Sequence, residues 1–101
     1  MPLHIQDHLP VPLSLADAGL GELFTVGAVR APAAAPEWAG QLEDIGFLAG
    51  EQVCIMARGL PGGDPLVVRV GLSTFALRVV EAACVKVLPV GSPSAVRKTQ
   101  A

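Results

Sequence analysis

The residues best suited to metal chemistry lie near the beginning of the sequence. His4, Asp7 and His8 are spaced at i, i+3 and i+4, so they would share one face if this segment formed a helical turn. Imidazole and carboxylate groups suit a divalent transition metal such as zinc or iron. Three prolines within residues 1–12 oppose a regular helix there, and adventitious capture of zinc would use the same side chains. The three residues are candidate metal ligands, but no cofactor is required.

Other reactive side chains are not arranged for catalysis. A hydrolytic triad needs a histidine beside its nucleophile, and the only two histidines lie in the proline-rich beginning. Glu43 and Asp44 are adjacent, so on a helix they point in different directions and are expected at a solvated helix end. Cys54 and Cys84 match no zinc pattern and are expected as small apolar side chains. We therefore predict that the protein is not an enzyme.

Composition narrows the classes of partner. The 101 residues suit one domain, and 51% apolar against 16% charged residues indicates a globular chain. Nine acidic residues face seven basic ones, which argues against a nucleic-acid surface. No stretch approaches the ~18 apolar residues of a membrane span, and the first residues lack the pattern of a secretory signal. We expect a cytoplasmic protein without direct membrane insertion, and the high apolar content would suit a homodimer.

One helix and one curved strand can be predicted in the first half. Residues 22–30 are rich in β-branched and aromatic types, and Gly27 within them indicates a bulge. Pro36 suits the first position of a helix that should run to about Asp44, with an apolar stripe at Trp38, Leu42 and Ile45. Gly46 is placed to cap its C-terminus. A helical turn is also expected near residues 13–17.

The second half alternates apolar and polar residues in short runs. These runs cover residues 53–58, 66–70, 75–79 and 85–87, and the glycine- and proline-rich residues 59–65 should form a hairpin loop. With the earlier strand, this pattern is typical of a small barrel rather than a βαβ sheet. We expect an irregular lead-in over residues 1–12, one domain over residues 13–90, and a flexible tail over residues 91–101.

Several pieces, in order, resemble the pattern of one family. They are Leu13, Leu15 and Gly21 at the entry to the first strand, Leu42–Gly50 with its spaced glycines, the strand Val53–Ile55, the hairpin Pro61–Pro65, and Phe75–Arg78 with Glu81 and Ala82. Together they resemble FeoA, a small protein of the bacterial ferrous iron uptake system. The lead-in, the insert over residues 31–36 and the tail depart from the pattern, and basic residues often found ahead of Leu42 are absent.

The resemblance implies a mainly β fold, an SH3-like barrel of about five strands with one or two short helices. It also implies an accessory or regulatory role on FeoB, a membrane permease with a cytoplasmic GTPase domain, which could recruit the protein to the inner membrane face. For the partner-binding surface we select the expected helix and its exit: Trp38, Glu43, Asp44, Phe47 and Leu48. The competing interpretation is that Trp38 packs on the barrel with Leu42 and Ile45.

Two other functions remain open from the sequence. Iron-dependent repressors carry a similar SH3-like domain, so the chain could be a related divalent-metal-binding carrier or sensor. The metal would then be held by His4, Asp7 and His8 or by carboxylates near Glu43. Nothing in the sequence supplies the DNA-binding helices of such repressors. The sequence does not say whether the protein activates, inhibits or assembles its partner.

Overall fold

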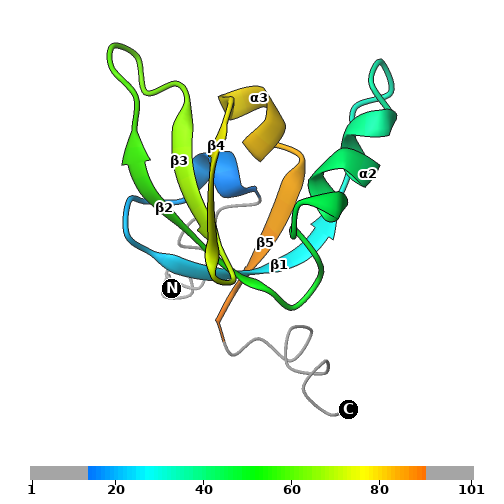
Figure 1. Cartoon of the computed structure of the whole chain (residues 1–101), viewed down its shortest axis with the longest axis horizontal. Coiled ribbons are helices and arrows are strands. Elements are labelled where there is room, and N and C mark those ends of the chain that lie inside the picture. The colour runs from blue at the N-terminus through cyan, green and yellow to red at the C-terminus, as the bar shows by residue number, and fades with distance from the viewer. Residues whose placement is uncertain (1–13, 91–101) are drawn as a thin grey trace, which may run out of the picture.

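Five strands and three short helical segments make up residues 14–90, the part of the chain that the computed structural model describes. In chain order they are the 3₁₀ turn η1 (Leu15–Asp17), β1 (Leu23–Val29), α2 (Glu37–Asp44), β2 (Gln52–Arg58), β3 (Leu66–Val70), β4 (Ser73–Leu77), α3 (Val79–Ala82) and β5 (Val85–Pro89) (Figure 1). The predicted helix and the predicted helical turn are both confirmed, with slightly shorter bounds. Among these residues no helix has both the length and the apolar character needed to cross a membrane.

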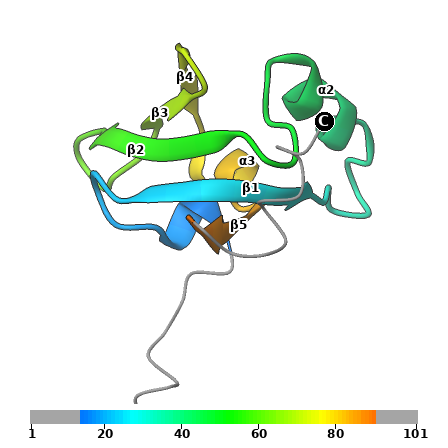
Figure 2. The same ribbon diagram turned by 90° about the horizontal axis from the view of Figure 1, so that it is seen from below.

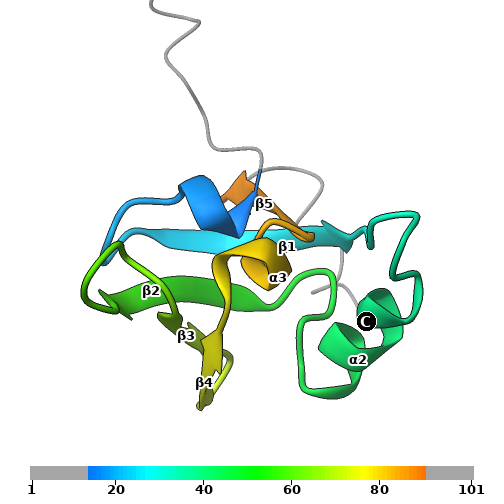
Figure 3. The ribbon, with the colours of Figure 1, turned by 90° about the horizontal axis from the view of Figure 1, so that it is seen from above.

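The strands form one antiparallel sheet in the order β4-β3-β2-β1-β5. β1 pairs with β2 through its first residues, Leu23 to Thr25, and with β5 through almost its whole length. In Figures 2 and 3 the β3–β4 hairpin consequently stands away from the layer of β1 and β2. The five expected strands are present, but β4 and β5 do not pair, so the expected barrel is corrected to an open, strongly curved sheet.

Two bulges help to curve the sheet. The register between β1 and β5 shifts between Val26 and Ala28, which leaves the predicted bulge at Gly27. A Cβ atom at Gly27 would lie only 3.1 Å from Leu88 Cδ1, so the close approach of the two strands favours glycine there. A second shift, between Ile55 and Ala57 on β2, was not expected. Bulges increase local twist, which lets a five-stranded sheet wrap around its own core.

The strand expected over residues 75–79 ends earlier than predicted, and its last residue belongs to a helix. Val79 alternates with Phe75 and Leu77 in sequence, yet it begins α3. Its N–H donates a hydrogen bond to Asp64 Oδ1 at 3.0 Å, and the Arg78 N–H donates to Glu81 Oε1 at 2.8 Å. These side-chain acceptors satisfy backbone donors at the start of the helix, which ends the strand at Leu77.

The core lies inside the curve of the sheet and extends under α2. Its largest fully buried side chains are Phe47, Leu15, Ile55, Leu66, Val26, Val53, Val68 and Val85. Phe47 follows the turn that ends α2, in which Gly46 has a φ of +122°. The Phe47 N–H donates a hydrogen bond to the Leu42 carbonyl at 3.1 Å. The Phe47 ring packs at 6.3 Å, centroid to centroid, from Phe75 on β4. This residue joins α2 to the sheet.

Neighbouring residues at the exit of α2 should therefore differ sharply in their effect on stability. Phe47→Ala removes a completely buried ring, and we expect it to lower the free energy of unfolding by about 3–5 kcal/mol. Leu48→Ala changes a side chain that is 48% exposed, and we expect a change within about 0.5 kcal/mol. Urea unfolding followed by circular dichroism measures both. Equal losses for the two variants would contradict the assignment of Phe47 to the core.

A candidate binding pocket between α2 and α3

The residues predicted to bind a partner do not form one surface. Glu43, Asp44 and Leu48 are exposed on α2 and its exit. Phe47 is completely buried, so its selection as a surface contact is corrected: the turn at Gly46 directs its ring into the core. Trp38 is half-buried and packs against the core, which includes Leu42, but Ile45 is exposed, so the competing interpretation holds only in part. The candidate ligands His4, Asp7 and His8 lie outside the described residues.

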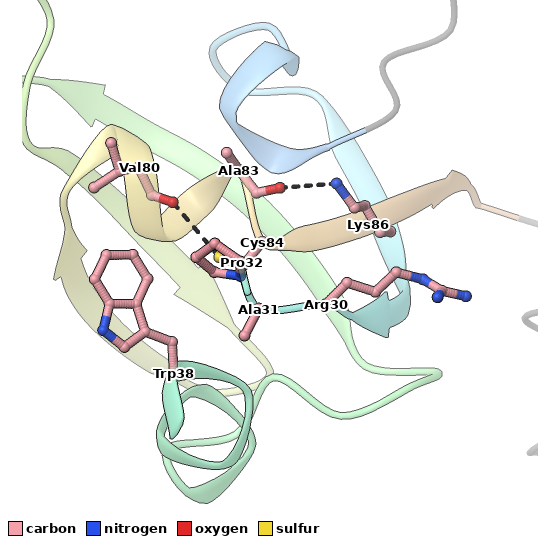
Figure 4. Close-up of a pocket in the computed structure, with 8 residues that line it drawn as sticks. All are labelled: Arg30, Ala31, Pro32, Trp38, Val80, Ala83, Cys84 and Lys86. Carbon is pink, nitrogen blue, oxygen red and sulfur yellow. Dashed lines mark hydrogen bonds between the residues drawn. The ribbon is translucent and has the colours of Figure 1, made fainter. Parts of the chain in front are cut away.

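Trp38 also lines a pocket that the sequence did not reveal. The pocket has a volume of about 660 Å³ and lies between α2, α3, the start of β5 and the segment that leaves β1. Its lining residues are Arg30, Ala31, Pro32, Trp38, Val80, Ala83, Cys84 and Lys86. In Figure 4, Trp38 and Val80 lie toward one end of this α2–α3 pocket, and the long side chains of Arg30 and Lys86 lie toward the other.

The segment between β1 and α2 determines where α2 begins relative to α3. The Arg30 N–H donates to the Cys84 carbonyl at 2.8 Å, which fixes the end of β1 beside the start of β5. The chain then turns away, with the Ala35 N–H bonded to the Pro32 carbonyl and the Trp38 N–H bonded to the Ala35 carbonyl. Proline fixes its own backbone and favours extended conformations before it. Residues 31–36 therefore act as a stiff spacer that separates the two helices.

The indole ring of Trp38 is in contact with a positively charged side chain. The guanidinium carbon of Arg78 lies 5.6 Å from the centroid of the Trp38 ring, within the range of a cation–π contact. Arg78 is in turn paired with Glu81, with 3.4 Å between Nη2 and Oε2. Because Arg78 precedes α3 and Trp38 lies on α2, this contact connects the two helices across the side of the α2–α3 pocket.

Cys84 is a buried residue of the pocket lining. Its side chain is almost completely buried, and its Sγ donates a weak hydrogen bond to the Val80 carbonyl at 3.6 Å. Burial raises the pKa of the Cys84 thiol; nearby Lys86 opposes this shift and Glu81 adds to it. A raised pKa keeps the thiol protonated and poorly nucleophilic at neutral pH. Cys84 therefore behaves as an apolar lining residue, as the sequence predicted for both cysteines.

Basic side chains gather around the α2–α3 pocket, although Glu81 pairs with one of them, Arg78. Residues 14–90 contain eight acidic and five basic side chains. Three of the five basic ones gather here: Arg30 and Lys86 in the lining, and Arg78 against Trp38. Lys86 Nζ donates to the Ala83 carbonyl at 3.0 Å, which keeps its ammonium group at the rim. The site is therefore an apolar pocket with a basic rim.

This arrangement of an apolar lining and two basic side chains suits the binding of another molecule. Among residues 14–90 no cluster of three or more histidine, cysteine, aspartate or glutamate side chains could hold a metal ion. Apart from Trp38, sequence reasoning missed every lining residue. Val80 was the one sequence signal that could have indicated the pocket, because it is a large apolar residue that follows an alternating strand. In the structure its side chain is 55% exposed.

Comparison with known proteins gives a consistent result. The model of the FeoA domain matches residues 13–89. The crystal structure of Stenotrophomonas maltophilia FeoA complexed with zinc, described as a procaryotic SH3 domain protein, is 38% identical, with a TM-score of 0.69 over 76% of this chain and 91% of that one. The SH3-like fold expected from the sequence is thus confirmed. No curated protein matches the chain.

More distant structures share the fold. Iron(II) transport protein A from Clostridium thermocellum is 28% identical, with a TM-score of 0.65 over 78% of this chain and 46% of that one. A manganese-dependent transcriptional repressor is 21% identical, with a TM-score of 0.65 over 84% of this chain and 46% of that one. The likeness to the repressor shows the fold alone.

The description of Cys84 can be tested by alkylation. In a Cys54→Ser variant Cys84 is the only thiol, and we expect iodoacetamide to modify it roughly tenfold more slowly in the folded protein than in urea at neutral pH. Because burial raises the pKa of the Cys84 thiol, the folded-state rate should rise only at a pH above the ordinary pKa of a cysteine thiol. Cys84→Ser, which leaves the half-buried Cys54, serves as the control. Equal rates for Cys84 in the folded and unfolded protein would contradict its burial.

Proposed function

Since the chain belongs to the FeoA family, whose members are accessory proteins of ferrous iron transport, we propose that it binds the cytoplasmic part of a FeoB-like GTPase-permease through the α2–α3 pocket. The observation that carries the proposal is the combination, in one pocket, of a half-buried tryptophan, an exposed valine and a basic rim. Binding would bring the protein to the inner face of the membrane.

The size and lining of the pocket suit one or two side chains of a protein segment. Its volume of about 660 Å³ lies within the range of sites that enclose small ligands. Val80 and Trp38 present apolar surface without being fully covered, and tryptophan is among the residues that contribute most at protein interfaces. An apolar side chain of the permease that enters this pocket would remove both residues from water.

The rim adds a requirement for charge. Arg30 and Lys86 belong to the lining, so a segment with carboxylates next to its apolar residue would be complementary. Charges at the rim of an interface chiefly steer association and select partners, whereas the apolar contact supplies most of the affinity. The partner segment is therefore expected to be apolar at its centre and acidic at its flanks.

Variants of the pocket should separate binding from folding. We expect Trp38→Ala and Val80→Asp each to weaken association by roughly thirtyfold or more, the range of an interface hot spot. Leu48→Ala, an exposed residue outside the lining, should change association less than about threefold. The measurement is association with the full-length permease of the same organism in nanodiscs, with and without guanine nucleotide, after each variant's thermal unfolding has been checked.

Two results would count against this proposal. Absence of binding in every nucleotide state, with a permease shown to be active, would remove the partner. Loss of binding in Leu48→Ala but not in Val80→Asp would instead locate the contact on the exposed side of α2, near Glu43 and Asp44.

The contribution of the basic rim to association can be tested separately. Neutralising Arg30 and Lys86 together, as Arg30→Gln with Lys86→Gln, should weaken association by about two- to tenfold and reduce its dependence on salt. Arg69→Gln on β3 removes an exposed positive charge away from the pocket and should leave both quantities unchanged. An equal effect of Arg69→Gln would indicate a response to net charge instead of a contact at the rim.

A further inference from the structure

The two edges of the sheet are protected to different degrees. β5 forms one edge, and it carries three features that discourage pairing with a further strand: the charged Lys86, the terminal Pro89, and a bridge between Ser14 and Lys86 that covers part of its outer side. Lysine, proline and local covering are the usual ways in which edge strands are kept from pairing with other chains. The β5 edge is therefore closed.

β4 forms the other edge and carries none of these features. Its residues, Ser73–Leu77, include no charged residue and no proline, and they pair with β3 in a continuous register without a bulge. Within residues 14–90 no strand pairs with the other side of β4. Ser73, Thr74 and Ala76 are exposed, so side chains of the domain do not cover this edge. Figure 2 shows the β3–β4 hairpin standing away from β1 and β2.

We infer that β4 is a self-association edge, at which two copies of this chain pair antiparallel around a two-fold axis at Phe75. An edge strand presents backbone N–H and C=O groups that an added strand can satisfy. Two-fold pairing requires the strand to be complementary to itself. In this register Thr74 of each copy lies opposite Ala76 of the other, so the same pair of small side chains occurs on both sides of the axis. No charge is brought against a like charge.

The residues that flank β4 also become neighbours in this arrangement. Leu72, in the turn before β4, is 93% exposed. The two-fold register places it opposite Arg78 of the second copy, whose side chain is 62% exposed and offers an aliphatic stem. Each copy would thus cover the other's most exposed flank. No residue of β4 lines the α2–α3 pocket, but the two proposed contacts share Arg78, which adjoins the pocket at Trp38.

A contact made by one five-residue strand and its flanks is small, so the dimer should depend on concentration. Sedimentation velocity of the full chain over a wide range of concentrations should show the mass shifting from one chain to two. We expect Thr74→Lys with Ala76→Lys to remain at the mass of one chain throughout, because four lysines then meet across the axis. The acidic pair, Thr74→Glu with Ala76→Glu, should behave likewise.

Mixing the lysine and glutamate variants should restore the dimer, since opposite charges then face each other. This step distinguishes loss of an interface from loss of folding. Gln41→Lys with Ala34→Lys adds two lysines at exposed positions away from β4 and should dimerise as the unaltered chain does. A monomer at every concentration, a dimer that persists in the lysine variant, or a mixture that stays monomeric would each overturn the inference.

Discussion

The burial of Phe47 is the constraint on which the arrangement of the helices depends. Its ring occupies the core beside Phe75, and the backbone on either side is fixed to different parts of the fold. Before it, the Phe47 N–H closes the end of α2 on Leu42; after it, the Gly50 N–H bonds to the Val26 carbonyl, and the Val26 N–H bonds to the Glu51 carbonyl. One end of α2 is therefore attached to β1, so the helix cannot turn away from the sheet.

The other end of α2 is positioned by weaker means. The Arg30 N–H holds the end of β1 on β5, residues 31–36 cross the gap, and the contact between Arg78 and Trp38 connects the helix with α3. A cation–π contact at an exposed site stabilises by about 0.5–1 kcal/mol, far less than the burial of a phenylalanine ring. The α2–α3 pocket thus lies where α2 is least firmly held, which suits a site that must admit another protein.

Local patterns predicted local structure well. The proline at position 36 and the stripe from Trp38 to Leu42 predicted α2, because a helix depends on residues close in sequence. Gly27 predicted its bulge because a glycine inside a strand marks such a site, although the partner strand β5 is distant in sequence. The pocket could not be predicted in this way, since Arg30 and Cys84 become neighbours only when β1 pairs with β5. The burial of Phe47 and the start of α3 at Val79 likewise depend on partners distant in sequence, Phe75 and Asp64. Net charge likewise could not predict the grouping of Arg30 and Lys86, because residues distant in sequence come together only in the folded chain.

The segment between β1 and α2 has a consequence for how such proteins can diverge. Residues 31–36 contribute no fully buried side chain, yet they join the end of β1 to the helix that carries Trp38, and two of them line the pocket. Insertions or deletions there would widen or narrow the pocket without opening the core. Evolution can therefore retune which partner the domain accepts in each lineage while the folding of the sheet is left undisturbed.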